Sequence, residues 1–293
     1  MFDYKQKYAE YLEAFERYLQ SCADNFNTEP PILGDAMRYS LLSGGKRVRP
    51  VLMLATAEML GVPQADVLPY AAALEMIHTY SLIHDDLPAM DNDDFRRGKP
   101  SCHKAFGEAY AILAGDALLN QALTVGFECA LQGEKYALAA KLMSEFAGMR
   151  GMIIGQIADL HYTSSGVPVS EEQLRYIQEN KTGKLLLLPL LIPSILADNR
   201  YYIRLEQFGK ELGRLFQITD DILDVVGAFD EIGKSVGKDE SADKLTCVKL
   251  YGLQGAKLRA DECLARCRAI LEGIDLPTAF LEELTLYVRE RNS

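Results

Sequence analysis

Apolar residues recur along almost the whole chain at intervals of three and four positions, with polar residues between them. This spacing is typical of helices that bury one face, whereas the strict alternation of half-buried strands is scarce. The sequence therefore predicts an all-α fold. Helices are expected over residues 3–23, 32–42, 50–60, 65–86, 105–130, 135–160, 171–197, 201–226, 246–272 and 277–289.

Glycine and proline residues fall between the predicted helices and mark their ends. No linker, low-complexity run or fixed-period repeat separates one part of the chain from another. We therefore expect a single domain over residues 1–293. Helices of this length predict a large helical bundle whose functional site is formed by side chains that project into a central cavity.

Composition excludes several classes of protein. The 31 Lys and Arg residues against 42 Asp and Glu residues give a net charge of −11, which disfavours binding to nucleic acid. The N-terminal segment has no continuous apolar run, and the most apolar stretch, residues 185–196, is too short for the roughly 20 residues of a membrane span. The six cysteines form no CxxC pair. We expect a cytoplasmic protein without membrane insertion.

Two acidic clusters each begin with adjacent aspartates inside an otherwise apolar helix. In the second cluster, Asp220 and Asp224 are four residues apart and therefore share one face of the helix. Like charges at this spacing repel each other, and a bound cation would offset that repulsion along a buried face. The alternative is a solvated acidic face. The pattern favours a cation site.

The first cluster contains Asp85, Asp86 and Asp91. Six residues correspond to about 600° of helical rotation, so Asp85 and Asp91 would not face the same way on a continuous helix. Pro88 should end or kink the helix after Asp86 and let the chain bring Asp91 back beside Asp85. A calcium loop of the EF-hand type is disfavoured, because its sixth position, counted from Asp91, is Arg96 rather than glycine.

Carboxylates without neighbouring Cys or clustered His residues suit hard ions such as Mg²⁺, which leave coordination positions open for substrate phosphates. The sequence also supplies basic clusters that could bind a phosphorylated ligand, although each alone is more often a solvated turn. None matches the P-loop motif. His78 lies seven residues before Asp85, on nearly the same helix face, which favours substrate contact over core packing. The basic clusters lie at residues 44–50, 95–99, 181–184 and 233–239.

With both acidic motifs and the basic clusters in this order, the sequence resembles the short-chain trans-polyprenyl diphosphate synthases, and among them the bacterial-type farnesyl diphosphate synthases. The resemblance runs from Gly44 to Arg291. It implies the isoprenoid synthase bundle, a homodimer, and Mg²⁺, three ions per active site with substrate bound, with Mn²⁺ as an alternative. It implies head-to-tail condensation of isopentenyl diphosphate with dimethylallyl or geranyl diphosphate to give (2E,6E)-farnesyl diphosphate.

The resemblance also implies roles for individual residues, with metal ligands on two sides of the cavity. Lys181, Thr182, Gln217, Asp85 and Asp220 would serve catalysis. Metal ligands would be Asp85, Asp86, Asp91, Asp220, Asp221 and Asp224; isopentenyl diphosphate would contact Gly45, Lys46, Arg49, His78 and Arg97; and the allylic diphosphate would contact Arg96, Lys181, Thr182, Gln217, Lys234 and Lys244, with Lys238 as an alternative to Lys234.

Product length should depend on the helix that carries the first cluster. Tyr80 lies five residues before Asp85, about 7.5 Å along the helix axis, and could form the floor of the cavity. In the family pattern, an aromatic residue here together with the two-residue insertion in the first acidic motif goes with the C15 product, and Ser81 beside Tyr80 is small. A geranylgeranyl diphosphate synthase with a deeper pocket is the nearest alternative. A terpene cyclase and a catalytically silent regulatory subunit are the others.

Overall fold

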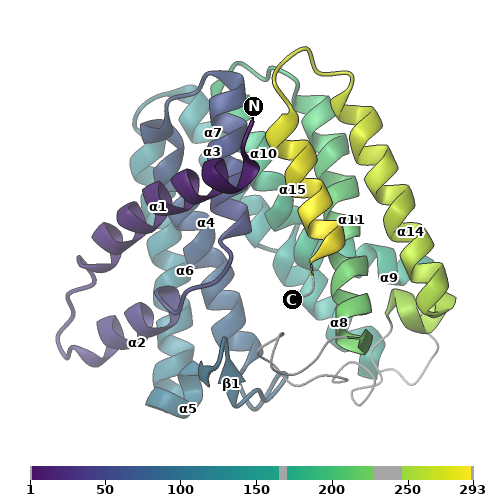
Figure 1. Cartoon of the computed structure of the whole chain (residues 1–293). Helices are drawn as coiled ribbons and strands as arrows, with labels where there is room; N and C mark the ends of the chain where they lie inside the picture. The colour runs from purple at the N-terminus through teal and green to yellow at the C-terminus, as the bar shows by residue number, and fades with distance from the viewer. Residues whose placement is uncertain (1, 165–169, 227–245, 292–293) are drawn as a thin grey trace. The chain divides into compact units, whose positions relative to one another are not determined.

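The computed structural model describes residues 2–164, 170–226 and 246–291 (Figure 1). The chain forms two compact units, Asp3–Lys141 and Leu142–Ser293, and Phe2 groups with the second unit. Helices make up nearly all of the described regular structure, which confirms the predicted all-α fold. The only strands in the described ranges are two strands of two residues each, which pair in one hairpin.

The first unit is organised around α4, which packs against α3 and α6, while α1 contacts α3 and α4. The side chain of Asp3 caps α1 by accepting a hydrogen bond from the amide of Gln6 at 3.0 Å. The residues that α4 buries are apolar except for Glu75 and Thr79. The elements are α1 (Tyr4–Ala23), α2 (Ile32–Leu41), α3 (Val48–Leu60), α4 (Gln64–Asp85), β1 (Phe95–Arg96), β2 (Lys99–Pro100), α5 (Cys102–Phe106) and α6 (Glu108–Ala130).

The second unit is organised around α11, which packs against α10, α14 and α15. Helix α10 is buried on nearly all sides, as its leucine-rich sequence requires. Thr246 caps α14, and Ser170 and Gln173 form a capping box at the start of α9. Helix α7 (Glu134–Ala147) crosses the boundary between the units, followed by α8 (Met152–Ser164), α9 (Glu171–Gln178), the π-helix η1 (Glu179–Gly183), α10 (Lys184–Leu196), α11 (Tyr202–Val226), α14 (Cys247–Leu271) and α15 (Ala279–Glu290).

Three expected helices are interrupted, and in each a glycine lies at the break. The expected helix over 246–272 is kinked at Gly252, whose φ of 69° and ψ of 166° are not helical. The expected helix over 105–130 breaks at Gly107, whose φ of 95° separates α5 from α6. The expected helix over 135–160 ends at Ala147 and restarts at Met152. At Gly151 a Cβ atom would overlap the backbone of Phe146, so only glycine fits that turn.

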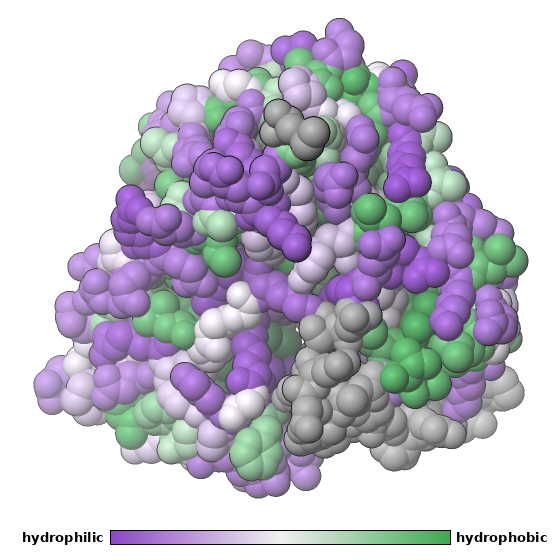
Figure 2. Space-filling model, viewed as in Figure 1, coloured by the Kyte–Doolittle hydropathy of each residue, from purple (hydrophilic) through white to green (hydrophobic). Residues whose placement is uncertain are grey.

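The described helices are all too short or too polar to cross a membrane. All six cysteines are free. Figure 2 shows a face on which hydrophilic residues predominate and hydrophobic residues form separate patches.

Candidate functional site

The first acidic cluster lies where α4 ends. Helix α4 stops at Asp85, ahead of Pro88, and the chain turns back on itself. The amide of Asp91 donates to the carbonyl oxygen of Asp85 at 2.8 Å, and the amide of Asp93 donates to the carbonyl oxygen of Asp86 at 3.1 Å. This confirms the prediction that the chain returns Asp91 to the side of Asp85.

Asp86 is a buried partner of Arg96. Its side chain is 2% exposed, and Nε of Arg96 lies 3.0 and 3.2 Å from its two carboxylate oxygens. Burial raises the pKa of Asp86, while the Arg96 guanidinium opposes that rise. Arg96 lies on strand β1 and pairs with Lys99 on β2. The two strands are joined by a tight turn at Arg97 and Gly98, which both have the positive φ that a two-residue hairpin turn requires. Arg96 is therefore anchored beside the first acidic cluster.

The residues predicted to bind isopentenyl diphosphate come together in the first unit. Nη1 of Arg97 donates to the carbonyl oxygen of Gly44, and a Cβ atom on Gly45 would lie only 2.9 Å from Cζ of Arg97. Glycine at position 45 therefore lets the guanidinium lie against the loop. The pKa of His78 is well below its usual value because the surrounding protein desolvates the ring and because Arg49 and Arg97 are near, so His78 is neutral at pH 7.

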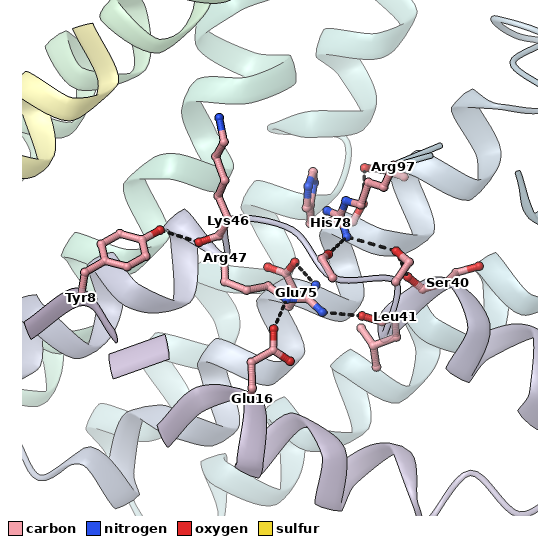
Figure 3. A network of polar contacts seen from close by, with 12 residues as sticks. Tyr8, Glu16, Ser40, Leu41, Lys46, Arg47, Glu75, His78 and Arg97 are labelled. Carbon is pink, nitrogen blue, oxygen red and sulfur yellow. Dashed lines mark hydrogen bonds and ion pairs between the residues drawn. The ribbon is translucent and has the colours of Figure 1, made fainter. Parts of the chain in front are cut away.

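Arg47 is the residue that sequence reasoning missed in this region. Its side chain is 0% exposed and bonds to Glu16, to Glu75 and to the carbonyl oxygen of Leu41 at 2.7 to 2.8 Å (Figure 3). The sequence shows only that Arg47 is a charged residue between two candidate ligand contacts, Lys46 and Arg49. Only the fold shows that it is buried.

The three aspartates of the second cluster have different environments. Asp220 pairs with Arg291 at 2.5 Å, and its side chain is 43% exposed. Asp221 accepts a hydrogen bond from the amide of Cys247 at 2.7 Å, at the start of α14. Asp224 is buried on the same helix. Asp220 and Asp224 therefore share one face of α11, as predicted, while Asp221 fixes the start of another helix.

Arg291 is held in place by more than its pairing with Asp220. Its Nη2 donates to the carbonyl oxygen of Phe216 at 3.2 Å, and its guanidinium carbon lies 4.0 Å from the centre of the Phe216 ring. The C-terminal basic residue is thus docked on α11 beside a candidate metal ligand.

Lys181 and Thr182 lie on the π-helix η1, a form of helix that is frequent at functional sites. The side-chain amide of Gln217 donates to the Thr182 hydroxyl at 2.8 Å, so the structure brings these two predicted residues together. Nζ of Lys181 lies 2.6 Å from the carboxylate of Asp159 on α8. A Cβ atom on Gly155 would overlap the backbone of Lys181, so glycine permits this close packing. Sequence reasoning missed Asp159, although it lies one helical turn after Gln156, which matches a polar position of the family.

Tyr80, the residue predicted to form the floor of the cavity, is buried on α4. Its ring meets His84 edge to face at 5.7 Å, and its hydroxyl has no hydrogen-bond partner among the described residues. Burial, with a smaller effect from Asp85, raises the pKa of Tyr80 to about 12, so the phenol stays protonated. The hydroxyl of Ser81 donates to the carbonyl oxygen of His78 at 2.8 Å.

Two predicted contacts, Lys234 and Lys244, and the alternative Lys238 lie outside the described residues. Within the described ranges, no three His, Cys, Asp or Glu side chains converge closely enough to bind one ion. Within the first unit, the turn after α4 brings Asp91 back to Asp85, and within the second unit Asp220 and Asp224 lie one turn apart on α11. Their carboxylates are oxygen donors of the kind that hard divalent ions prefer.

The sequence model of the polyprenyl synthetase family matches residues 30–271. The chain belongs to the polyprenyl synthetase family. This polyprenyl synthetase is 42% identical over 275 residues to a farnesyl diphosphate synthase of Micrococcus luteus, covering 93% of this chain and 94% of that protein. A farnesyl diphosphate synthase of Geobacillus stearothermophilus is 44% identical over 270 residues, covering 90% of each chain. A chloroplastic geranylgeranyl pyrophosphate synthase of Capsicum annuum is 45% identical over 251 residues, which are 84% of this chain and 68% of that protein.

Solved structures agree with this family assignment. A geranyltransferase from Legionella pneumophila superposes with a TM-score of 0.86 at 35% identity, covering 98% of this polyprenyl synthetase and 97% of that chain. A geranyltransferase from Helicobacter pylori, complexed with magnesium and isoprenyl diphosphate, superposes with a TM-score of 0.82 at 32% identity, covering 96% of each chain. The fold is that of the isoprenyl synthases, and the chain is a prenyltransferase.

Proposed function

We propose that this polyprenyl synthetase condenses isopentenyl diphosphate with dimethylallyl and then geranyl diphosphate to give (2E,6E)-farnesyl diphosphate. One observation carries the proposal: Lys46, Arg49, Arg97 and neutral His78 gather in the first unit, apart in sequence from the Lys181 and Thr182 pair that would serve an allylic diphosphate. Two separate groups of phosphate-binding side chains suit an enzyme that joins two diphosphates. The farnesyl diphosphate synthases among the relatives support this substrate class.

The donor set fits Mg²⁺, with three ions per active site as the proposed number and Mn²⁺ as an alternative. Asp85 and Asp91, which the turn after α4 brings together, and Asp220 and Asp224 on α11 would hold the ions through carboxylate oxygens. Asp86 and Asp221 would support these sites through Arg96 and α14. Bound magnesium supplies positive charge to the allylic diphosphate as its carbon–oxygen bond breaks.

Side chains of the protein would bind the departing diphosphate and orient the groups around it. Arg96 and Lys181, and by resemblance Lys234 and Lys244, would bind the departing diphosphate. Gln217 fixes the Thr182 hydroxyl in one orientation. A new carbon–carbon bond forms as the allylic carbon–oxygen bond breaks, and the proton lost from the isopentenyl unit leaves on the diphosphate. No protein nucleophile is therefore needed.

Tyr80 supports the C15 product over the C20 alternative. A buried aromatic ring on α4, ahead of the metal-binding end, would limit the depth available to a growing prenyl chain. The small Ser81 beside it leaves the ring of Tyr80 as the bulky group at this depth. The geranylgeranyl pyrophosphate synthases among the relatives keep the C20 product as the second candidate.

The test is incubation with isopentenyl diphosphate, dimethylallyl or geranyl diphosphate and Mg²⁺, followed by chromatography of the dephosphorylated product. A C15 alcohol supports the proposal, and a C20 alcohol supports the alternative. A cyclised hydrocarbon would indicate a terpene cyclase, and no product would indicate a regulatory subunit. Asp85→Asn should lower kcat by a factor on the order of 10³. Asp94→Asn, an exposed aspartate of the same acidic run that pairs with Lys104, is the matched control and should keep full turnover.

We also propose that the chain forms a homodimer. Helix α6 and the residue that caps its C-terminus expose large apolar side chains, among them Phe127 at 73% and the capping residue Leu131 at 88% exposed, four residues apart. A second copy of the chain would cover them. Sedimentation equilibrium should give twice the mass of the chain, and Leu131→Asp should shift the protein toward the monomer, whereas a monomeric wild type contradicts the proposal.

The compartment proposed is the cytoplasm. Six free cysteines, five of them buried, suit a reducing environment. Fractionation of the source cells with an antibody to the chain would test this, and recovery in a secreted or membrane fraction would contradict it.

A further inference from the structure

The loop of residues 43–49, which carries Lys46 and Arg49, has an unusual backbone. Gly44 and Gly45 have φ values of 80° and 125°, and Arg47 has φ 49° and ψ 37°, in the left-handed region. A residue with a side chain is disfavoured there because its Cβ atom comes too close to the following carbonyl oxygen. Contacts from the rest of the unit must therefore hold Arg47 in this conformation.

The Arg47 side chain supplies the first set of contacts. Its Nε donates to Glu16 on α1, its Nη1 donates to Glu75 on α4, and its Nη2 donates to the carbonyl oxygen of Leu41, the last residue of α2 (Figure 3). The planar guanidinium can reach three acceptors in three directions, which the single ammonium of a lysine cannot do in the same geometry. The loop is thereby tied to three helices.

Tyr8 supplies the second contact. Its hydroxyl donates a hydrogen bond to the carbonyl oxygen of Lys46, the peptide group that leads directly into Arg47. Helix α1 therefore holds the loop at two adjacent points, through Tyr8 and through Glu16. Both anchors act on the backbone between the two candidate diphosphate contacts.

The anchoring determines where the phosphate-binding side chains point. Figure 3 shows the Lys46 side chain extending away from Arg47, toward the side where His78 lies. Glu75, which holds Arg47, is one turn before His78 on α4, so one helix fixes both the loop and the histidine. A shift of the loop would move Lys46 and Arg49 relative to His78.

We propose that Tyr8 and Arg47 are positioning residues for the isopentenyl diphosphate pocket, acting through the backbone of the loop of residues 43–49. The proposal rests on the proposed function, because the role of Lys46 and Arg49 does. It adds α1, an element with no predicted contact to either substrate, as the part of the fold that sets affinity for isopentenyl diphosphate.

The test compares two tyrosines of the first unit. Tyr8→Phe removes the hydroxyl that bonds to Lys46, and Tyr70→Phe removes a hydroxyl that donates to the carbonyl oxygen of Tyr136 at 2.7 Å, away from the loop. Tyr8→Phe should raise the KM for isopentenyl diphosphate about three- to ten-fold, as loss of one hydrogen bond predicts, and leave the KM for geranyl diphosphate within two-fold. Tyr70→Phe should change neither KM, although it removes a bond of the same kind.

A second pair of variants tests the Arg47 anchor without removing a fully buried charge. Glu16→Ala removes one acceptor of Arg47, and Glu13→Ala removes an exposed ion pair with Arg17 one turn earlier on the same helix. Glu16→Ala should raise the KM for isopentenyl diphosphate several-fold, with kcat nearly unchanged, and Glu13→Ala should not. Calorimetric titration with isopentenyl diphosphate alone should show the same difference in dissociation constant.

The outcomes separate this inference from the proposed function. If wild-type protein makes product and Tyr8→Phe and Glu16→Ala leave the isopentenyl KM unchanged, the positioning role is wrong while the function stands. A rise in both substrates' KM, equal in size, would indicate general loss of structure and would also overturn it. If wild-type protein neither makes product nor binds isopentenyl diphosphate, the proposed function fails and the inference fails with it.

Discussion

Replacing Arg47 with methionine should destabilise the protein strongly, because the change leaves a carboxylate buried without its cation. Glu75 is 2% exposed, and its oxygen lies 2.7 Å from Nη1 of Arg47. At an effective dielectric constant of about 20, that separation corresponds to an attraction of about 6 kcal/mol before the desolvation of both charges is counted. Breaking a buried pair from one side costs about 3 to 5 kcal/mol. We expect a loss in this range for Arg47→Met.

Removing both charges should restore most of that stability. In Arg47→Met with Glu75→Met, apolar side chains replace the buried pair, and such exchanges are often neutral or stabilising. The free energy of unfolding of the double variant should therefore be about 2 to 3 kcal/mol higher than that of Arg47→Met alone. It would still lose the loop anchor, so its KM for isopentenyl diphosphate should stay high while its stability recovers.

Urea denaturation followed by circular dichroism gives the free energies of unfolding for the four proteins of this cycle. Hydrogen exchange read by mass spectrometry should place the loss in α1 and α4 and leave α14 and α15 protected as in the wild type. A loss below 1 kcal/mol for Arg47→Met, or a double variant as unstable as the two single losses added together, would refute the reasoning.

Three further measurements test other parts of the first unit. Tyr70→Phe should lower the free energy of unfolding by about 1 kcal/mol because a hydrogen bond is lost. Tyr80→Phe should leave the free energy of unfolding unchanged or raise it, because the buried Tyr80 hydroxyl has no hydrogen-bond partner among the described residues. The midpoints of urea denaturation test both expectations. The NMR resonance of His78, assigned with His78→Asn, should titrate with a midpoint below pH 6.5. The unfolded chain then binds a proton at His78 more readily than the folded protein does, so the free energy of unfolding falls as the pH drops below about 6.5. A midpoint at or above 6.5 contradicts the argument that the ring is desolvated. Tyr80→Ala should lengthen the main product from C15 toward C20 by deepening the cavity, and an unchanged C15 product would remove Tyr80 from the control of chain length.

The helices and the turn after α4 could be predicted because they depend on local chemistry. The spacing of apolar residues fixes where helices form. Pro88 ends α4 for a steric reason that holds in any fold, so the return of Asp91 to Asp85 followed from the sequence. The interruptions at Gly107, Gly151 and Gly252 were missed because an isolated glycine is tolerated within many helices. At Gly151 the close backbone of Phe146 admits only glycine, and the sequence does not show that contact.

The contacts that connect distant parts of a unit could not be predicted. Arg47 bonds to Glu16 and Glu75, which are 31 and 28 residues away, and nothing in the local sequence marks Arg47 and Glu75 as buried. The role of Asp221 at the start of α14 likewise depends on where that helix begins in space. A sequence shows which residues carry charge, but the burial that makes the charge important depends on the packing of helices.

Several candidate ligand-binding groups in each unit already form ion pairs with groups of the opposite charge. Asp86 pairs with Arg96, Lys181 pairs with Asp159, and Asp220 pairs with Arg291. Binding a metal diphosphate at Lys181 or Asp220 would therefore exchange one ion pair for another rather than add a new one. Because an existing pair must be broken first, the net gain in free energy is smaller than the new contacts alone would suggest. Such an exchange favours product release, since the protein's own charges satisfy each other as soon as the diphosphate leaves.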